Sequence, residues 1–156
     1  SSTSRGLGDV YKRQALYNMA GKDMDLALAI AEAIAEVDES IILLGLANSK
    51  MIDAGKQLGL RVANEVFADR AYQADGSLVP RKLPGAVIHD KDEAIARTVR
   101  MVTEGKVTAI TGEEVEIAAH SICVHGDNPS AVEFVKNIRT QLTARGVEIA
   151  PIREIV

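Results

Sequence analysis

Apolar residues recur along the chain at spacings that predict helices and strands in alternation. Between residues 26 and 37 they recur close to helical spacing, and either Asp23 or Asp25 stands where it can cap the helix. Ile41–Leu46 is a continuous apolar run, as expected of a strand covered on both faces. The predicted core stripe of this first helix is Leu26, Ile30, Ile34 and Val37.

The alternation continues to the end of the chain, interrupted by one long irregular stretch. A second helix is predicted behind Asn48 and Ser49 and ends at Gly59. Residues 68–86 are irregular, and long loops inside compact domains are usually functional. The other predicted elements are a strand at 61–67, a helix capped by Asp90 and closed by Gly105, a hairpin at 107–117, a strand at 121–124, a helix behind Asp127 or Asn128 with a core stripe of Phe134, Val135, Ile138 and Leu142, and a short strand at 147–150.

Strands that alternate with helices predict an α/β fold with mainly parallel strands. The pattern leaves two architectures open, a doubly wound sheet and a barrel. A full β/α barrel has eight strand–helix units and typically about 250 residues. The four or so units in these 156 residues would therefore make about half of one barrel.

Residues 1–14 differ from the rest because they show no apolar period. They resemble the translated adapter-like peptides found at the ends of metagenomic gene fragments. We therefore expect a non-native or disordered leader at 1–14 and a single domain at 15–156.

Composition narrows the classes of function. The chain carries 18 basic and 22 acidic residues, a net charge of −4, and no Trp, which argues against a nucleic-acid partner. No apolar run reaches the roughly 18–20 residues of a membrane span, so no membrane partner is expected. A single cysteine, Cys123, permits no internal disulfide, and the cytoplasm is the expected location.

Candidate chemistry lies where two predicted strands end, because α/β folds place their sites at the carboxyl ends of strands. E-V-F-A-D-R-A-Y, residues 65–72, ends the second strand, and C-V-H-G-D-N-P, residues 123–129, ends the third. The alternatives without a functional role are a helix cap at Asp127 and a surface ion pair between Asp69 and Arg70. The candidate site residues are Glu65, Asp69, Arg70, Tyr72, Arg81, His125, Gly126 and Asp127.

Standard cofactor motifs are missing from the sequence. It contains no G-x-x-x-x-G-K-[ST] loop, no G-x-G-x-x-G after a strand, no H-E-x-x-H and no paired C-x-x-C. No self-contained metal site is therefore predicted, and metal dependence stays open.

Five segments carry a family resemblance. They are A-L-Y-N at 15–18, E-V-F-A-D-R-A-Y at 65–72, D-G-S-L-V-P-R at 75–81, P-G-A-V-I at 84–88 and C-V-H-G-D-N-P at 123–129. Through them the chain resembles the C-terminal part of the LamB/YcsF family, from Ala15 to about Ile149. The family's upstream motifs of the D-L-N-C-D, C-G-F-H-A-G-D and G-A-H-P kind do not occur here.

The resemblance implies a fold, a reaction and partners. The implied fold is a partial β/α barrel related to the glycoside hydrolase/deacetylase barrels. The implied reaction is that of the A subunit of an ATP-dependent 5-oxoprolinase, a hydrolase that opens the cyclic amide 5-oxo-L-proline to L-glutamate together with subunits B and C. A chain that covers only part of the family pattern is expected to be inactive alone.

The residues suit that chemistry. Arg70 and Arg81 would bind phosphate or the substrate carboxylate, with Tyr72 and Gly126 beside them. His125 with Asp127 would serve as an acid/base pair, and Glu65 and Asp69 would assist or orient it. Two alternatives remain: a metal-dependent carbohydrate deacetylase, and a non-catalytic subunit that completes a partner's site.

Overall fold

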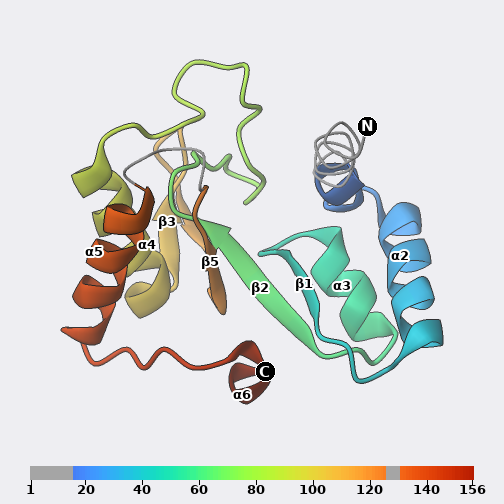
Figure 1. Ribbon diagram of the computed structural model, residues 1–156. Helices are drawn as coiled ribbons and strands as arrows, with labels where there is room; N and C mark the ends of the chain where they lie inside the picture. Colours follow the sequence, from blue (N-terminus) through green and yellow to red (C-terminus); the bar gives the residue numbers. More distant parts are fainter. Residues whose placement is uncertain (1–15, 126–130) are drawn as a thin grey trace, which may run out of the picture.

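A parallel sheet of three strands lies at the centre of the computed structural model, which describes residues 16–125 and 131–156. Its strands are β1 (Leu43–Leu46), β2 (Val62–Phe67) and β5 (Ser121–Cys123), in the order β1-β2-β5. Both pairings are parallel, and helices lie to either side of the sheet (Figure 1). The predicted α/β class with parallel strands is confirmed.

Two helices cover the sheet on the β1 side. They are α2 (Met24–Val37), whose first turn is capped by Asp23, and α3 (Lys50–Gln57). Ala27 and Ala31 are completely buried in α2, whereas Val37 is 78% exposed. The prediction that Val37 belongs to the core stripe is therefore wrong, because the close approach of α2 and α3 is made by small residues.

β1 is not covered on both faces as its apolar run predicted. Leu43 and Leu46 are buried, but the Leu44 side chain between them is 41% exposed. Leu44 and Leu46 lie on the same face of the strand, because side chains alternate between faces, so this face is covered at Leu46 and open at Leu44.

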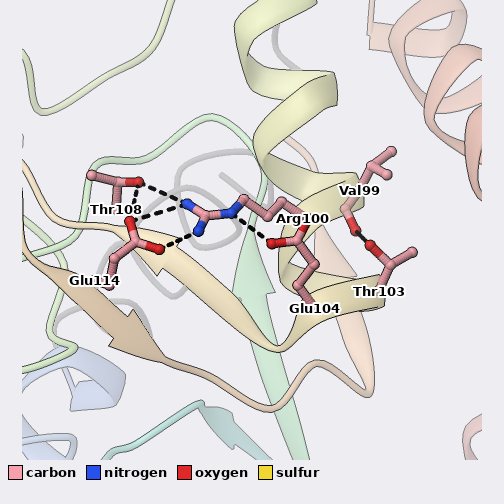
Figure 2. A network of polar contacts seen from close by, with 6 residues as sticks. All are labelled: Val99, Arg100, Thr103, Glu104, Thr108 and Glu114. Atoms are coloured by element: carbon pink, nitrogen blue, oxygen red, sulfur yellow. Dashed lines mark hydrogen bonds and ion pairs between the residues drawn. The ribbon is translucent and has the colours of Figure 1, made fainter.

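On the other side of the sheet, α4 (Lys91–Glu104) leads into a hairpin of β3 (Lys106–Thr108) and β4 (Glu114–Glu116). The Asp90 carboxylate accepts a hydrogen bond from the Glu93 N–H, and Gly105 ends the helix at φ 65°, as predicted. Figure 2 shows the Arg100 guanidinium between Glu104 of its own helix and Glu114 of the hairpin. This exposed network ties the end of α4 to β4.

α5 (Ala131–Thr143) packs on α4 through Phe134, Ile138 and Leu142, which are buried, while Val135 is 46% exposed. Val135 was thus wrongly assigned to the core. A short helix, α6 (Ile152–Ile155), ends the chain.

The strand predicted at 147–150 is also wrong, since these residues form no strand in the structure. The Val147 N–H donates to the Leu142 carbonyl and so finishes α5. A strand needs a neighbouring backbone to pair with, and no strand of the described sheet pairs with this run, in which Ile149 is 43% exposed.

Two sequence predictions fall outside the described residues. They are the leader at 1–14 and the capping of the last helix by Asp127 or Asn128. Within the described ranges, no helix is long and apolar enough to cross a membrane.

A tight contact between α3 and the sheet gives a test of this fold. A Cβ added at Gly55 would lie 2.5 Å from Val62 Cγ1 and 2.8 Å from Leu43 Cδ2. Overpacking costs about 1–3 kcal/mol, of which the better helix propensity of alanine returns at most about 1 kcal/mol. We therefore expect Gly55→Ala to lower the free energy of unfolding in urea.

Gly21→Ala is the matched control, because a Cβ there meets its neighbours at 3.4 Å or more. Its urea midpoint should stay close to that of the unchanged chain. Equal midpoints for the two variants would contradict the packing of α3 described above.

Candidate functional site

The segment between β2 and α4 folds back over the carboxyl end of β2, where the sequence placed the candidate chemistry (Figure 1). Two isolated antiparallel β-bridges, between Arg70 and Val87 and between Tyr72 and Leu78, pair separate parts of this segment with each other. The segment turns at Asp75 and Gly76, with Gly76 at φ 81°. The segment between β2 and α4 is therefore a loop with its own backbone pairing, and it covers the carboxyl end of β2.

The buried side chain of Arg70 links distant parts of this loop. Its side chain is only 6% exposed, and it donates from Nε to the Ala86 carbonyl at 3.2 Å and from Nη2 to the Val79 carbonyl at 2.6 Å. Burial lowers the pKa of Arg70, and the positive charge of Arg81 lowers it further. Within the described residues, Nη1 has no hydrogen-bond partner.

Tyr72 is completely buried, and its hydroxyl accepts a hydrogen bond from the Phe67 N–H at 2.9 Å. Burial raises the pKa of Tyr72 to about 12. The phenol thus closes the end of β2. Its predicted contact with a ligand stays a prediction, but this geometry favours a structural role.

Asp69, His125 and Arg81 form a row at the ends of β2 and β5. The Asp69 carboxylate lies 2.9 and 3.1 Å from Nδ1 of His125, and Nη2 of Arg81 lies 2.6 Å from Nε2 on the other side of the ring. The His125 and Asp69 side chains are 19% and 23% exposed, so this pair is mostly shielded from water, whereas Arg81 is exposed. Three groups that are distant in sequence are thus joined into one hydrogen-bonded chain.

Two cavities adjoin this row. One, of about 270 Å³, is lined by Tyr17, Glu65, Phe67, Cys123 and both arginines as well as His125. The other, of about 210 Å³, lies between the row and the start of α4, and is lined by Asp69, His89 and Lys91 among others. A larger cavity of about 690 Å³ between α4 and α5 contains none of the predicted site residues.

Glu65 faces the first cavity and is held by Tyr17, whose hydroxyl donates to Glu65 Oε2 at 2.6 Å. Burial and this carboxylate raise the pKa of Tyr17, so the phenol stays a donor at neutral pH. The Tyr17 ring also packs edge to face on the Phe67 ring, and the centroids of the Phe67 and His125 rings are 6.0 Å apart. The cavity therefore combines a hydrogen-bonded carboxylate with an aromatic wall.

The convergence expected from parallel strand ends is confirmed for the residues that the structure describes. Glu65, Arg70, Arg81 and His125 line one cavity, and Asp69 contacts His125 from the loop. Gly126 and Asp127 lie outside the described residues, and the catalytic and binding roles of the whole set stay predictions.

Sequence reasoning missed Tyr17 as a site residue. The signal was present, because Tyr17 belongs to the A-L-Y-N segment that carried part of the family resemblance. No pattern within one chain, however, pairs a tyrosine with a glutamate 48 residues away. Cys123 entered the sequence analysis only through the absence of a second cysteine, and the structure places it in the cavity wall.

Metal-binding potential is limited in the described parts of the chain. There, no three His, Cys, Asp or Glu side chains gather closely enough to hold a metal ion. The Asp69–His125 pair brings two such groups into contact at the candidate site.

Comparison with known proteins gives consistent matches. The family model described as "LamB/YcsF family" matches residues 6–156. The chain is 63% identical over 135 residues to the A subunit of the 5-oxoprolinase of Alkaliphilus metalliredigens, covering 86% of this chain and 53% of that protein. It is 56% identical over 142 residues to the corresponding 5-oxoprolinase A subunit of Campylobacter jejuni, covering 91% and 56%.

A solved structure agrees with this. The crystal structure of a lactam utilization protein from Thermus thermophilus matches with a TM-score of 0.77 and 41% identity, over 86% of this chain and 53% of that one. The chain spans about half the length of the curated relatives it matches.

The cavity wall offers a test through its single thiol. Burial, and then the carboxylates of Glu65 and Asp69, raise the pKa of Cys123 to about 11. At neutral pH this leaves about 100-fold less thiolate than in a cysteine of pKa 9.0. We expect iodoacetamide to label the folded chain at least that much more slowly than a free cysteine peptide, with the rate rising up to about pH 11.

The urea-unfolded chain is the control, and it should react at the rate of the peptide. Since the chain has one cysteine, the labelled mass reports this site alone. If the folded chain reacted as fast as the peptide at pH 7, the Cys123 thiol would be reactive. This result would contradict the raised pKa of a thiol buried in the cavity wall.

Proposed function

This chain belongs to the LamB/YcsF family, and from that membership we propose that it is part of the A subunit of an ATP-dependent 5-oxoprolinase. Two relatives at 56% and 63% identity are named as 5-oxoprolinase A subunits, and the similar solved structure is named a lactam utilization protein. The structural observation that carries the proposal is the row Asp69–His125–Arg81 beside a cavity that also contains Glu65.

The proposed substrate, 5-oxo-L-proline, combines an unreactive cyclic amide with a carboxylate. Water attacks such an amide slowly, because electron donation from the ring nitrogen makes the carbonyl carbon a poor electrophile. Transfer of the terminal phosphoryl group of ATP to the amide oxygen, with release of ADP, activates this carbon. Water then adds to the carbon, and the C–N bond breaks as the ring nitrogen takes up a proton. A second water releases phosphate from the resulting acyl phosphate and gives L-glutamate. A site for this chemistry needs cations for the anionic groups and an acid/base group for water.

His125 is the proposed acid/base group of this chain. The sequence offered Asp127 as its partner, with Asp69 as a further orienting group. The contact at 2.9 Å favours Asp69 for the orienting role, since a carboxylate on Nδ1 fixes both the tautomer and the plane of the ring. Glu65, held by Tyr17, is the second proposed proton-handling group.

Arg81 and Arg70 are the proposed anion ligands. Both line the cavity, and a guanidinium can bind a carboxylate or a phosphate through two hydrogen bonds. Arg70 uses its Nε–H and one N–H of Nη2 to hold the loop, so both N–H groups of Nη1 and the second one of Nη2 have no partner within the described residues. Arg81 is exposed and has greater freedom to move.

The remaining parts of the proposal concern the assembled enzyme. Since the chain spans about half of its relatives, we propose that the other half completes a β/α barrel of the glycoside hydrolase/deacetylase type. Subunits B and C are the proposed partners in the cytoplasm, and ATP is a substrate of the whole assembly. The relatives' names designate one lettered subunit of an enzyme, which supports a complex of several subunits.

The direct test measures ATP-dependent release of glutamate from 5-oxo-L-proline. A full-length subunit that contains this sequence should turn over with subunits B and C present, whereas the 156-residue chain with B and C should not. In the full-length subunit, His125→Gln should lower turnover about 10²–10⁴-fold, the range of a lost acid/base group. Asp69→Asn should lower turnover less.

Lys82→Ala is the matched control for both variants, because Lys82 lies on the same loop and lines neither cavity. It should leave turnover unchanged. A parallel assay of acetate release from N-acetylated sugars tests the deacetylase alternative. Release of acetate without any release of glutamate would reject the proposed function, and full activity of His125→Gln would reject the assigned role.

A further inference from the structure

Both nitrogens of the His125 ring are engaged by groups of the described chain. Asp69 is on Nδ1, and Nη2 of Arg81 is 2.6 Å from Nε2. A guanidinium carries donors and no acceptor, so Nε2 must be the acceptor in this contact. The ring is then neutral, with its proton on Nδ1 directed at Asp69, and Nε2 has no lone pair free for another proton.

The two arginines beside His125 are held very differently. Arg70 is buried and fixed by two backbone carbonyls, whereas Arg81 is exposed, and its contact with His125 is the one side-chain hydrogen bond that it makes among the described residues. Of the two guanidiniums, Arg81 is therefore free to change partner without breaking the loop.

Both guanidiniums line both cavities. The carboxylates that line the same cavities have other partners: Asp69 contacts His125, Glu65 accepts from Tyr17, and Asp90 accepts from the Glu93 N–H. The mutual repulsion of the two guanidiniums is visible in Arg70, whose pKa is lowered first by burial and then by the charge of Arg81. An anion bound between them would remove this repulsion. It would also form charge-assisted hydrogen bonds, which are stronger than a bond to a neutral imidazole.

We propose that Arg81 is an anion-operated latch on His125. In the structure Nη2 of Arg81 lies against Nε2 of His125. A small molecule carrying a carboxylate or a phosphate binds between Arg81 and Arg70, draws Arg81 off the ring, and so frees Nε2 to take a proton. For the identity of the natural anion the latch rests on the proposed function; the latch itself is a property of these three side chains.

The latch defines a class of substrate. A neutral lactam would enter the cavity without displacing Arg81, and His125 would stay blocked. Only a lactam that brings its own anionic group would find a free imidazole nitrogen, which separates 5-oxo-L-proline from an otherwise identical ring without the carboxylate.

Diethyl pyrocarbonate tests this, because it reacts with a free imidazole nitrogen and its product on each histidine is resolved by peptide mass. The reaction is run on the chain in a zwitterionic buffer, with His120 as the internal reference, since His120 lines neither of the two cavities. Arg81→Ala should raise the rate at His125 about tenfold, the weight of one charged hydrogen bond. Lys82→Ala should leave it unchanged.

Ligands provide an arm that needs no variant. 5-Oxo-L-proline should raise the rate at His125 in the unchanged chain, and 2-pyrrolidinone, the same lactam without a carboxylate, should not. Inorganic phosphate is the third probe: acceleration by phosphate alone assigns the latch to a phosphate group, and acceleration by 5-oxo-L-proline alone assigns it to the carboxylate. Neither probe should accelerate the reaction in Arg81→Ala.

The latch is wrong if Arg81→Ala reacts no faster than the unchanged chain, if both anions leave the rate at His125 unchanged or lower it, or if 2-pyrrolidinone accelerates it as much as 5-oxo-L-proline. These readouts do not use turnover. A working latch in a protein that releases no glutamate would reject the proposed function alone, and glutamate release without a latch would reject only the inference.

Discussion

The pairing of β2 with a parallel strand on each side is the constraint on which the candidate site depends. Phe67 of β2 stands opposite Cys123 of β5. Asp69 and His125 each come two residues later, so equal steps from one paired position bring the carboxylate and the imidazole to 2.9 Å. A slip of one residue in this register would turn the side chains of the slipped strand to the opposite face, so that the carboxylate and the imidazole would no longer meet.

The loop over this edge depends on a buried charge. A guanidinium is costly to bury, and Arg70, which is almost fully enclosed, offsets part of this cost by donating to the backbone carbonyls of Val79 and Ala86. The same side chain leaves one edge toward the cavities. The guanidinium that fixes the loop thus also contributes positive electrostatic potential to the cavities. Arg70 therefore serves both the fold and the candidate site.

The elements that the sequence predicted well are those set by local chemistry. The caps at Asp23 and Asp90, the stop at Gly105 and the hairpin after it each depend on a few neighbouring residues. The failures needed knowledge of distant neighbours. The apolar run at 147–150 lacks a strand beside it, and Leu44 and Val135 face outward although their patterns resemble core.

The candidate site shows the same division. Parallel strand ends made the meeting of Glu65, Arg81 and His125 predictable without coordinates. Which carboxylate would hold the imidazole was not predictable, because Asp69 and Asp127 were both close to a strand end. That Tyr72 would point inward and Tyr17 toward Glu65 depends on packing, which no single-chain pattern encodes.

The hydroxyl of Tyr72 has a consequence for how this sequence can diverge. Phenylalanine is the nearest neighbour of tyrosine in shape and would fill the same space, so drift between the two is usually tolerated in a core. Here the exchange would leave the Phe67 N–H without its acceptor in a dry interior, a loss of about 1–3 kcal/mol. Selection on folding alone is therefore enough to keep a tyrosine at this position, so its persistence among descendants would carry no information about catalysis.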